Sequence, residues 1–463
     1  MFVGRDLELS TIIDTIKTPA RHILLFGNRR VGKTTLAIEA AKQSNLLFVN
    51  YECKKDSLDK NAQAMANVLY ENGIFPAKLI PNSMRDLFAY VNSLNKRIVF
   101  LIDEYPYLYN DEKIDTVDSI FQNIIDQCSS NINIILSGSH IGMMKQLTRE
   151  ANPLFGRFDA YIHLQELDYL EASQFYPTLS NYDKAAYYAV FGGSPFVLEQ
   201  LDYEKGLEYN IKKTFLNINS TVNMYLSENY TSDLSTKDAA NKILEALGNS
   251  RIKYTILEQK IGLKKTGLLS KQLNTLLDMN FVGKNYPINK PTDKKKITYY
   301  IKNNALRFYY TYVYGKTNTI MYIGADEFYE QYIKDSIKTY ISYRFEDIAM
   351  QFISKEVKNG LIKDVTNLGT YYYDDIATKT NGEFDVAIQR KDVYDIVEVK
   401  YFKDKVNKKI IEQEVNQIKG IKELNVDGIG FIAINGFEDD VKGLDYMFDG
   451  NDIYFSEKQH SIN

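Results

Sequence analysis

A run near the start of the chain, residues 27–34, combines glycines with a lysine and a hydroxyl. It reads GNRRVGKT and fits the pattern G-x-x-x-x-G-K-[ST]. In such a loop, backbone N–H groups surround nucleotide phosphates, Lys33 reaches the β- and γ-phosphates, and the Thr34 hydroxyl binds Mg²⁺. The pattern predicts a site for ATP and Mg²⁺. The residues expected to hold the nucleotide here are Gly27, Asn28, Arg29, Arg30, Val31, Gly32, Lys33, Thr34 and Thr35.

Two carboxylates, Asp103 and Glu104, end the apolar run 98–102. This is the Walker B pattern, a buried parallel strand that ends in acids. If the strand lies beside the strand of the phosphate loop, Asp103 comes near Mg²⁺ and Glu104 can orient the attacking water. The alternative is a core strand that merely ends in two solvated acids.

Three more polar residues have two interpretations each. Ser137 and Ser139 follow the apolar run 132–136, where they can sense a γ-phosphate or simply begin a loop. Arg157 lies in a turn, where it can stabilise transition-state charge or form a surface ion pair.

A further charged group lies near the C-terminus, on two predicted strands at 383–388 and 393–400. Glu398 and Lys400 are two residues apart and share one face, and a hairpin turning near Lys391 sets Asp385 opposite Glu398. Close carboxylates on apolar strands repel unless a divalent cation binds them. The pattern predicts a second metal site; the alternative is a surface ladder of ion pairs on an α/β domain.

Several domains must position these groups. The chain has 463 residues, of which 44% are hydrophobic, enough for about three domains. Its net charge of −4 decides nothing about nucleic acid, and two distant cysteines with four histidines make neither a disulfide framework nor a zinc site. The sequence has no signal peptide and no apolar run of about 18 residues, which predicts a cytoplasmic protein without membrane segments.

The middle of the chain predicts a winged helix-turn-helix. Three short helices are expected at 237–247, 255–261 and 266–279, followed by a hairpin of strands 281–284 and 297–301. Lysines in the turn and in the wing suit DNA phosphates, although such a module also serves as a lid or protein adaptor, and charged loops are usually only solvated. These lysines are Lys264, Lys265, Lys290, Lys294, Lys295 and Lys296.

The first half of the chain resembles the archaeal-type ATPase family, in the STAND branch of the AAA+ proteins and related to origin-recognition ATPases. The resemblance covers about residues 1–235 and rests on motifs at 2–5, 27–34, 101–108, 137–139, 153–157 and 192–195. It implies that Gly4, Arg5 and the turn at Pro195 pack around adenine. It also implies that Asp103 and Glu104 are the Walker B acids and that Ser137 or Ser139 is sensor 1. No second sensor arginine is identified after Pro195.

The C-terminal pattern resembles the PD-(D/E)XK nuclease superfamily, and a domain of unknown function of this kind follows many archaeal-type ATPases. The resemblance implies Glu346 as a helical acid, Asp385 and Glu398 as metal ligands, and Lys400 as the catalytic lysine.

The predicted fold class is α/β in four parts. These are a P-loop AAA+ core with a parallel sheet at 1–165, a helical lid at 166–235, a winged helix-turn-helix at 236–314 and a restriction-endonuclease-like α/β domain at 315–463. The expected function is an ATP-hydrolysing switch coupled to a DNA-binding, nuclease-like domain. The rivals are a non-catalytic regulator or scaffold bound to a partner protein, and a ring-shaped homo-oligomeric motor in which Arg157 acts across subunits.

Overall fold

The described chain forms two compact units in the computed structural model. The structure describes residues 2–110, 113–128, 131–229, 237–262, 267–375 and 380–454. Unit 1 is Met1–Glu166 with Asp278–Asn280, and unit 2 is Leu167–Leu277 with Phe281–Asn463. Among the described helices, none combines the length and the apolar character needed to cross a bilayer.

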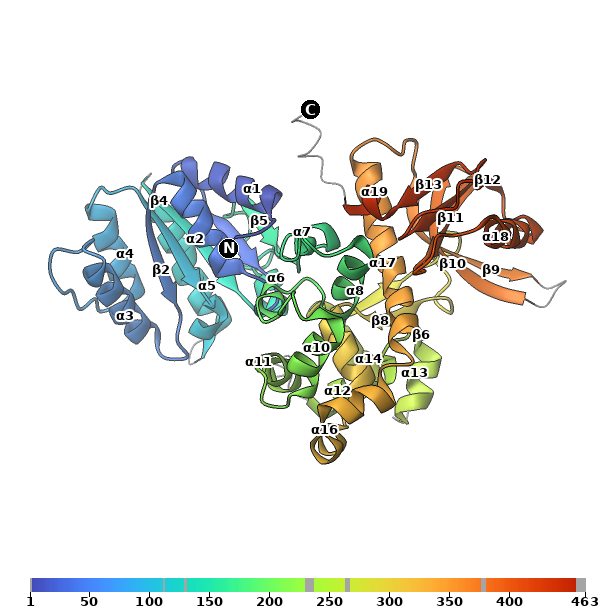
Figure 1. Ribbon diagram of the computed structural model, residues 1–463. Helices are drawn as coiled ribbons and strands as arrows, with labels where there is room; N and C mark the ends of the chain where they lie inside the picture. Colours follow the sequence, from blue (N-terminus) through green and yellow to red (C-terminus); the bar gives the residue numbers. More distant parts are fainter. Residues whose placement is uncertain are drawn as a thin grey trace. The chain divides into compact units, whose positions relative to one another are not determined.

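Unit 1 is built around a parallel sheet with helices packed around it (Figure 1). The five strands follow the order β2-β3-β4-β1-β5. Strands β3 and β4 contain the apolar runs expected at 98–102 and 132–136, β5 was not predicted, and every residue of β1, β3 and β4 is buried. The strands are β1 (Ile23–Phe26), β2 (Leu47–Glu52), β3 (Ile98–Asp103), β4 (Ile132–Gly138) and β5 (Ala160–His163). The helices are α1 (Asp6–Lys17), α2 (Lys33–Ser44), α3 (Leu58–Glu71), α4 (Met84–Ser93), η1 (Tyr105–Tyr109), α5 (Ile114–Gln127) and α6 (Ile141–Gln146).

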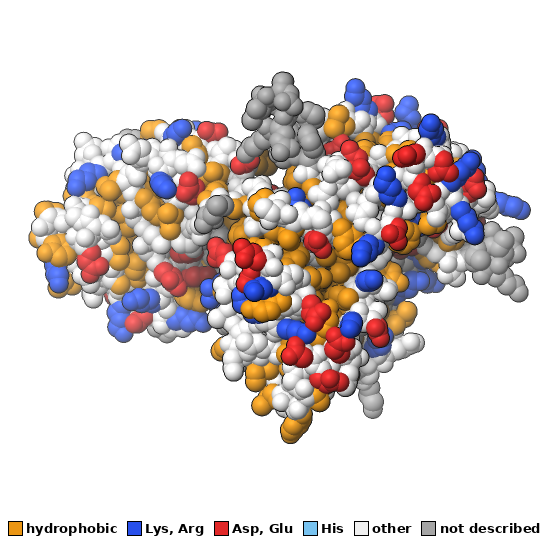
Figure 2. Space-filling view, in the orientation of Figure 1, with side chains coloured by type: hydrophobic (Ala, Val, Ile, Leu, Met, Phe, Trp, Pro, Cys, Tyr) orange, Lys and Arg blue, Asp and Glu red, His pale blue; other side chains and the backbone are white. Residues whose placement is uncertain are grey.

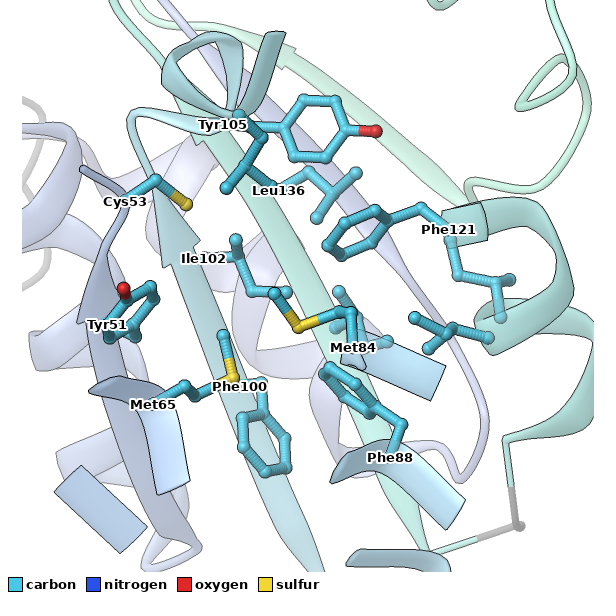
Figure 3. Close-up of a cluster of buried hydrophobic side chains, with 14 of the residues drawn as sticks. Tyr51, Cys53, Met65, Met84, Phe88, Phe100, Ile102, Tyr105, Phe121 and Leu136 are labelled. Carbon is cyan, nitrogen blue, oxygen red and sulfur yellow. The ribbon is translucent and has the colours of Figure 1, made fainter. Parts of the chain in front are cut away.

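Helices cover both faces of this sheet because its strands alternate between two cores. On β3, Val99 and Leu101 pack with α1 and α2, whereas Phe100 and Ile102 pack with α3, α4 and α5. Figure 3 shows the second core, where Met65, Phe88 and Phe121 surround the sheet side chains. The result is a three-layer α/β unit, in which parallel strands carry polar groups at their carboxyl ends.

Unit 2 begins with short helices and a small antiparallel sheet. Its first helices are α7 (Tyr169–Ser173), α8 (Asn181–Phe191), α9 (Pro195–Leu198), α10 (Gly206–Ile211), η2 (Lys212–Leu216), α11 (Thr221–Met224) and η3 (Tyr225–Asn229). Next come α12 (Lys237–Leu247), β6 (Ile252–Lys253), α13 (Tyr254–Ile261), α14 (Leu268–Asp278), β7 (Val282–Asn285) and β8 (Thr298–Ile301). The small sheet has the order β6-β8-β7. Three helices and this hairpin are the elements expected of a winged helix, while the turn with Lys264 and Lys265 lies outside the described residues.

The rest of unit 2 is a mixed sheet between helices. The helices are α15 (Asn304–Tyr312), α16 (Thr317–Tyr332), α17 (Ile337–Lys358), α18 (Lys408–Gly420) and α19 (Gly450–Tyr454). The strands are β9 (Asn367–Asp375), β10 (Thr380–Arg390), β11 (Val393–Lys400), β12 (Val426–Ala433) and β13 (Tyr446–Asp449), in the order β13-β12-β11-β10-β9. Strands β9, β10 and β11 pair antiparallel, whereas β11, β12 and β13 pair parallel. Ile411 and Ile418 of α18 share a core with Ile396 and Phe431 of the sheet.

Candidate functional site

The loop between β1 and α2 needs its two outer glycines. A Cβ on Gly27 would lie 2.2 Å from the carbonyl oxygen of Leu164, the residue after β5. Gly32, directly before α2, has a φ of 94°, in the region that favours glycine. The loop therefore turns tightly against the end of β5 and leads its backbone N–H groups into the start of a helix.

The side chain of Lys33, the first residue of α2, lies inside this loop. Its side chain is buried, and Nζ donates hydrogen bonds to the carbonyl oxygens of Gly27 at 2.9 Å and Asn28 at 3.1 Å. Burial lowers the pKa of Lys33, while the nearby carboxylates of Glu104 and Asp103 oppose this shift. The loop thus holds an ammonium group next to two acids.

The Thr34 hydroxyl meets the first Walker B acid. Thr34 Oγ1 donates a 2.5 Å hydrogen bond to Oδ2 of Asp103. The expectation that the Walker B strand lies beside the loop strand is wrong, because β4 lies between β1 and β3. Asp103 still reaches Thr34, since all three strands are parallel and end at the same edge. A hydroxyl next to a carboxylate is a donor pair that fits Mg²⁺.

The second acid, Glu104, contacts one of the two serines. Ser139 donates to Glu104 Oε2 from its hydroxyl at 2.8 Å and from its backbone N–H at 3.2 Å. Glu104 itself has a φ of 50°, which turns the chain sharply after β3. In contrast, Ser137 is fully buried, and its hydroxyl has no hydrogen-bond partner among the described residues. The structure brings Ser139, and not Ser137, to the acid.

A buried carboxylate that the sequence analysis missed fixes the segment after Glu104. Asp118 of α5 accepts hydrogen bonds of 2.8 Å from the hydroxyls of Tyr105 and Tyr109 and of 2.7 Å from Asn152. The sequence held one signal for it, an acid on the apolar face of a helix. These bonds hold η1, whose Tyr107 hydroxyl accepts a 3.0 Å hydrogen bond from Arg29 of the loop. The loop and the Walker B segment are therefore joined by side chains.

Arg5 is tied to the loop backbone. This buried guanidinium donates to the carbonyl oxygen of Val31 at 3.3 Å and to that of Gln165 at 2.5 Å. It thus joins the phosphate loop to the segment after β5. Gly4 precedes it with a φ of 66°, and Pro195 is the first residue of α9 in unit 2. Contact of these residues with adenine stays a prediction.

In the folded unit, Arg157 lies far from the loop of the same chain. It precedes β5, at the amino-terminal edge of the sheet, whereas the loop lies at the carboxyl edge. Its guanidinium forms a two-pronged ion pair with Asp126, at 2.9 and 3.0 Å. It also donates to the carbonyl oxygens of Pro153 and Phe155. This geometry is the ion pair that the sequence allowed, formed at the edge of the sheet opposite the loop.

In unit 2, the hairpin predicted around Asp385 is present. Strands β10 and β11 pair with Val386 opposite Val397, which sets Asp385 opposite Glu398. The pairing of β10 with β9 shifts register between Phe384 and Ala387, so that Asp385 lies in an irregularity of the strand. Bulges of this kind redirect side chains beside functional sites.

Lys400 lies between two carboxylates. Its Nζ is 3.1 Å from Oε2 of Glu398 and 2.5 Å from Oε1 of Glu414 on α18. Burial alone would lower the pKa of Lys400, but both carboxylates raise it. Burial raises the pKa of Glu398, with Lys400 opposing. The sequence predicted the first pair and missed Glu414.

The helical acid Glu346 lies in one group of acids with Asp385 and Glu398. We call this group the acid cluster, and its members are Glu346, Asp347, Glu383, Asp385 and Glu398. Burial and the charge of Asp385 raise the pKa of Glu346 to about 9. Burial also raises the pKa of Asp385, although Arg251 opposes this. Among the described residues, no three His, Cys, Asp or Glu side chains are arranged to hold a metal ion. In this arrangement, the acid cluster does not fit the metal site that was expected.

A guanidinium lies in the acid cluster instead. Arg251 is 3.1 Å from Oδ1 of Asp347, 3.2 Å from Oε1 of Glu383 and 3.4 Å from Oδ1 of Asp385. Burial alone would lower the pKa of Arg251, but these carboxylates raise it. Nothing in the local sequence signals this contact, because Arg251 and Asp385 are 134 residues apart.

The wing, residues 286–297, packs against the same sheet. Two hydrogen bonds join the side chain of Asn289 to the backbone of Tyr372, at 2.8 and 3.1 Å. The ammonium of Lys296 lies 3.7 Å above the centre of the Tyr372 ring, and that of Lys290 lies 5.4 Å from it. Two of the lysines expected to face DNA therefore cover an aromatic ring of β9.

Two family models match parts of the chain. Residues 2–201 match a model described as an ATPase domain predominantly from Archaea, and residues 309–414 match one described as archaeal and bacterial proteins of unknown function. The uncharacterized protein MJECL04 of Methanocaldococcus jannaschii is 26% identical over 359 residues, which cover 76% of this chain and 77% of that protein.

Solved structures are similar to the chain at lower identity. The Walker-type ATPase PABY2304 of Pyrococcus abyssi has a TM-score of 0.51 and 17% identity, covering 67% of this chain and 96% of its own. The ORC2 protein of Aeropyrum pernix, in its ADPNP–ADP complexes, has a TM-score of 0.45 and 12% identity, covering 73% and 93%. The first likeness concerns the fold. The chain thus contains a P-loop segment that matches a model of ATPase domains found mainly in Archaea, followed by a segment that matches a model of archaeal and bacterial proteins of unknown function.

Proposed function

We propose that unit 1 binds ATP with Mg²⁺ and hydrolyses it. The observation that carries the proposal is the 2.5 Å contact between Thr34 and Asp103, next to the buried ammonium of Lys33. The loop N–H groups bind the phosphates, and Lys33 exchanges its two carbonyl partners for phosphate oxygens. When bound, Mg²⁺ neutralises charge on the β- and γ-phosphates. Glu104 orients the attacking water, and Ser139 holds the carboxylate of Glu104.

ATP binding and turnover by three variants test this proposal. Lys33→Ala should lose ATP binding, whereas Glu104→Gln should bind ATP and hydrolyse it at least about 100-fold more slowly. Lys42→Ala, which removes an exposed lysine from the far end of α2, is the matched control and should behave as wild type. Tight ATP binding by Lys33→Ala would contradict the assignment of residues 27–34 as the phosphate loop.

We further propose that the C-terminal domain is nuclease-like and acts on DNA, under control of the ATPase. Two observations favour this over a neutral scaffold. The element order α17, β9, β10, β11, α18, β12 sets Asp385 opposite Glu398, and Lys400 and Glu346 lie beside them. These charged side chains are partly buried, and such an arrangement needs a reason, because removing charges from water costs free energy. Acidic and basic side chains are interspersed on the face seen in Figure 2, so the proposal rests on the acid cluster and not on a basic surface.

Cleavage of supercoiled and linear DNA tests this second proposal. Wild type and Glu398→Ala are compared with Mg²⁺ or Mn²⁺, with and without ATP. Glu412→Ala, an exposed acid of α18, is the matched control. Metal-dependent cutting that is lost only in Glu398→Ala supports the nuclease. Its absence under every condition, with ATP turnover intact, favours a regulator or scaffold that binds a partner protein. The mass of the protein with and without ATP identifies a homo-oligomeric ring.

A further inference from the structure

The contact between Arg251 and the acid cluster joins two different segments of unit 2. Arg251 directly precedes β6 of the winged-helix segment, whereas Asp347 belongs to α17 and Asp385 to β10. We infer that this contact is autoinhibitory: the Arg251 guanidinium stands where a divalent cation would bind, and the winged-helix segment must withdraw before the acid cluster can work. The inference rests on the proposed nuclease-like function of that cluster.

Arg251 and a divalent cation exclude one another for two reasons. Both carry positive charge, and both need the carboxylate of Asp385, whose Oδ1 lies 3.4 Å from Arg251 Nη1. A Mg²⁺ ion needs oxygen ligands at about 2.0–2.1 Å in a nearly octahedral shell, which a guanidinium among the same oxygens prevents. The guanidinium neutralises the acids by longer hydrogen bonds instead. The acid cluster is therefore stable without a metal as long as Arg251 remains.

Asp347 fixes Arg251 in this position from a second side. Its Oδ1 accepts from Arg251 at 3.1 Å, while its Oδ2 accepts from the buried Arg307 of α15, also at 3.1 Å. Arg344 lies 3.6 Å from the same Oδ2. Because Asp347 has two other cationic neighbours, it does not need Arg251 for its own charge. Asp385 and Glu383 have Arg251 as their cationic neighbour in the described contacts.

The wing provides a way to withdraw Arg251. Strand β6 begins at the residue after Arg251 and pairs with β8, the second strand of the wing, through Ile252 and Tyr299. The wing in turn is attached to β9 by Asn289, by Lys296 above Tyr372 and by a 2.7 Å hydrogen bond from the Ile288 N–H to the Thr370 carbonyl. Since Arg251 is bonded directly to β6, which pairs with the wing strand β8, a ligand that pulls the wing from β9 also pulls Arg251 from Asp385.

Mn²⁺ binding to the full chain, measured without nucleotide, tests the inference. Arg251→Gln should bind Mn²⁺ at least about tenfold more tightly than wild type, and Arg251→Gln with Asp385→Asn should lose this gain. Arg390→Gln is the matched control, since it removes an arginine that pairs with Asp395 at the other end of β11. Asn289→Ala provides a second route, because it loosens the wing without changing the acid cluster, and it should also raise the affinity for Mn²⁺.

The results separate this inference from the nuclease proposal. Unchanged Mn²⁺ affinity in a folded Arg251→Gln, or in Asn289→Ala if Arg251→Gln does not fold, overturns autoinhibition. If Arg251→Gln gains Mn²⁺ binding through Asp385 but cuts no DNA, the nuclease proposal fails and closure by Arg251 stands. If wild type cuts DNA as fast as Arg251→Gln, the nuclease stands and autoinhibition fails. Faster cutting and tighter binding together support both.

Discussion

Thr34 and Asp103 are joined by a 2.5 Å hydrogen bond although they are 69 residues apart and their strands are not neighbours. The bond spans the end of β4, which separates the loop strand from the Walker B strand. Its geometry sets a hydroxyl and a carboxylate at one point of the sheet edge. This pair is where the proposed Mg²⁺ would be held.

Thr34→Val should therefore weaken ATP binding when Mg²⁺ is present. The valine keeps the shape of the side chain and removes its hydroxyl, so we expect a loss of about tenfold or more in Mg²⁺-dependent affinity. Thr34→Ser keeps the hydroxyl and is the matched control. Titration of a fluorescent ATP analogue with and without Mg²⁺ measures the effect. Equal Mg²⁺ dependence in Thr34→Val and wild type would contradict the assignment.

The two serines at the end of β4 should differ in their effects. Ser139→Ala removes a hydroxyl that contacts Glu104, so we expect kcat for ATP to fall by about tenfold or more with little change in KM. Ser137→Ala removes a buried hydroxyl that has no partner in the described structure. This change should leave turnover intact and change stability by about 1 kcal/mol or less. A larger loss of turnover in Ser137→Ala than in Ser139→Ala would reverse the assignment.

Local patterns predicted the groups that lie within one motif. The loop, Asp103 and the hairpin of Asp385 and Glu398 each follow from a few neighbouring residues, because a turn or an alternating strand fixes their geometry. The order of the strands did not follow. The order of β1, β3 and β4 along the chain can be read from the sequence. Their order in the sheet depends on side-chain packing, which puts β4 between the other two.

The contacts that were missed join distant parts of the chain. The sequence analysis made no prediction for Arg251, and only the packed structure brings it to Asp385 and Asp347. Lys290 and Lys296 read as a solvated or DNA-facing charge run, yet both lie near the ring of Tyr372. A long flexible side chain can contact any of several partners. Its sequence neighbours do not determine which partner is within reach.

Gly27→Ala should destabilise unit 1 as well as weaken nucleotide binding. The added Cβ would lie 2.2 Å from the carbonyl oxygen of Leu164, which is backbone and cannot rotate away. We expect a loss of about 1–3 kcal/mol in the free energy of unfolding. Gly420→Ala is the control, because no atom lies within 4 Å of its added Cβ. Denaturant unfolding compares the two, and equal stability would show that the loop moves away from β5.

Arg157→Ala should leave ATP turnover by an isolated chain unchanged. Its partner Asp126 is half exposed, so the lost ion pair should cost roughly 0.2–1 kcal/mol of stability. Turnover measured over a range of protein concentrations provides the test. If kcat rises with concentration in wild type and not in Arg157→Ala, the arginine acts across subunits, as the ring model proposes.

Stability of unit 1 should fall as the pH is lowered through the range of His22. This buried imidazole accepts a 3.2 Å hydrogen bond at Nδ1 from the Ile134 N–H. Burial lowers its pKa, although Asp159 and Asp126 oppose this. Because the folded-state pKa lies below the unfolded value of about 6.5, the neutral form stabilises the fold above that pH, and this contribution is lost as the pH falls below it.

His22→Asn isolates this effect, since its side-chain oxygen can accept from the Ile134 N–H but does not titrate. We expect the Tm of wild type to decrease more between about pH 7.5 and pH 5 than the Tm of His22→Asn, by roughly 2–4 °C per kcal/mol for a domain of this size. Scanning calorimetry in buffers of equal ionic strength measures both curves. Parallel curves would mean that the pKa of His22 differs too little between the folded and unfolded states to matter, and that other groups dominate the pH dependence.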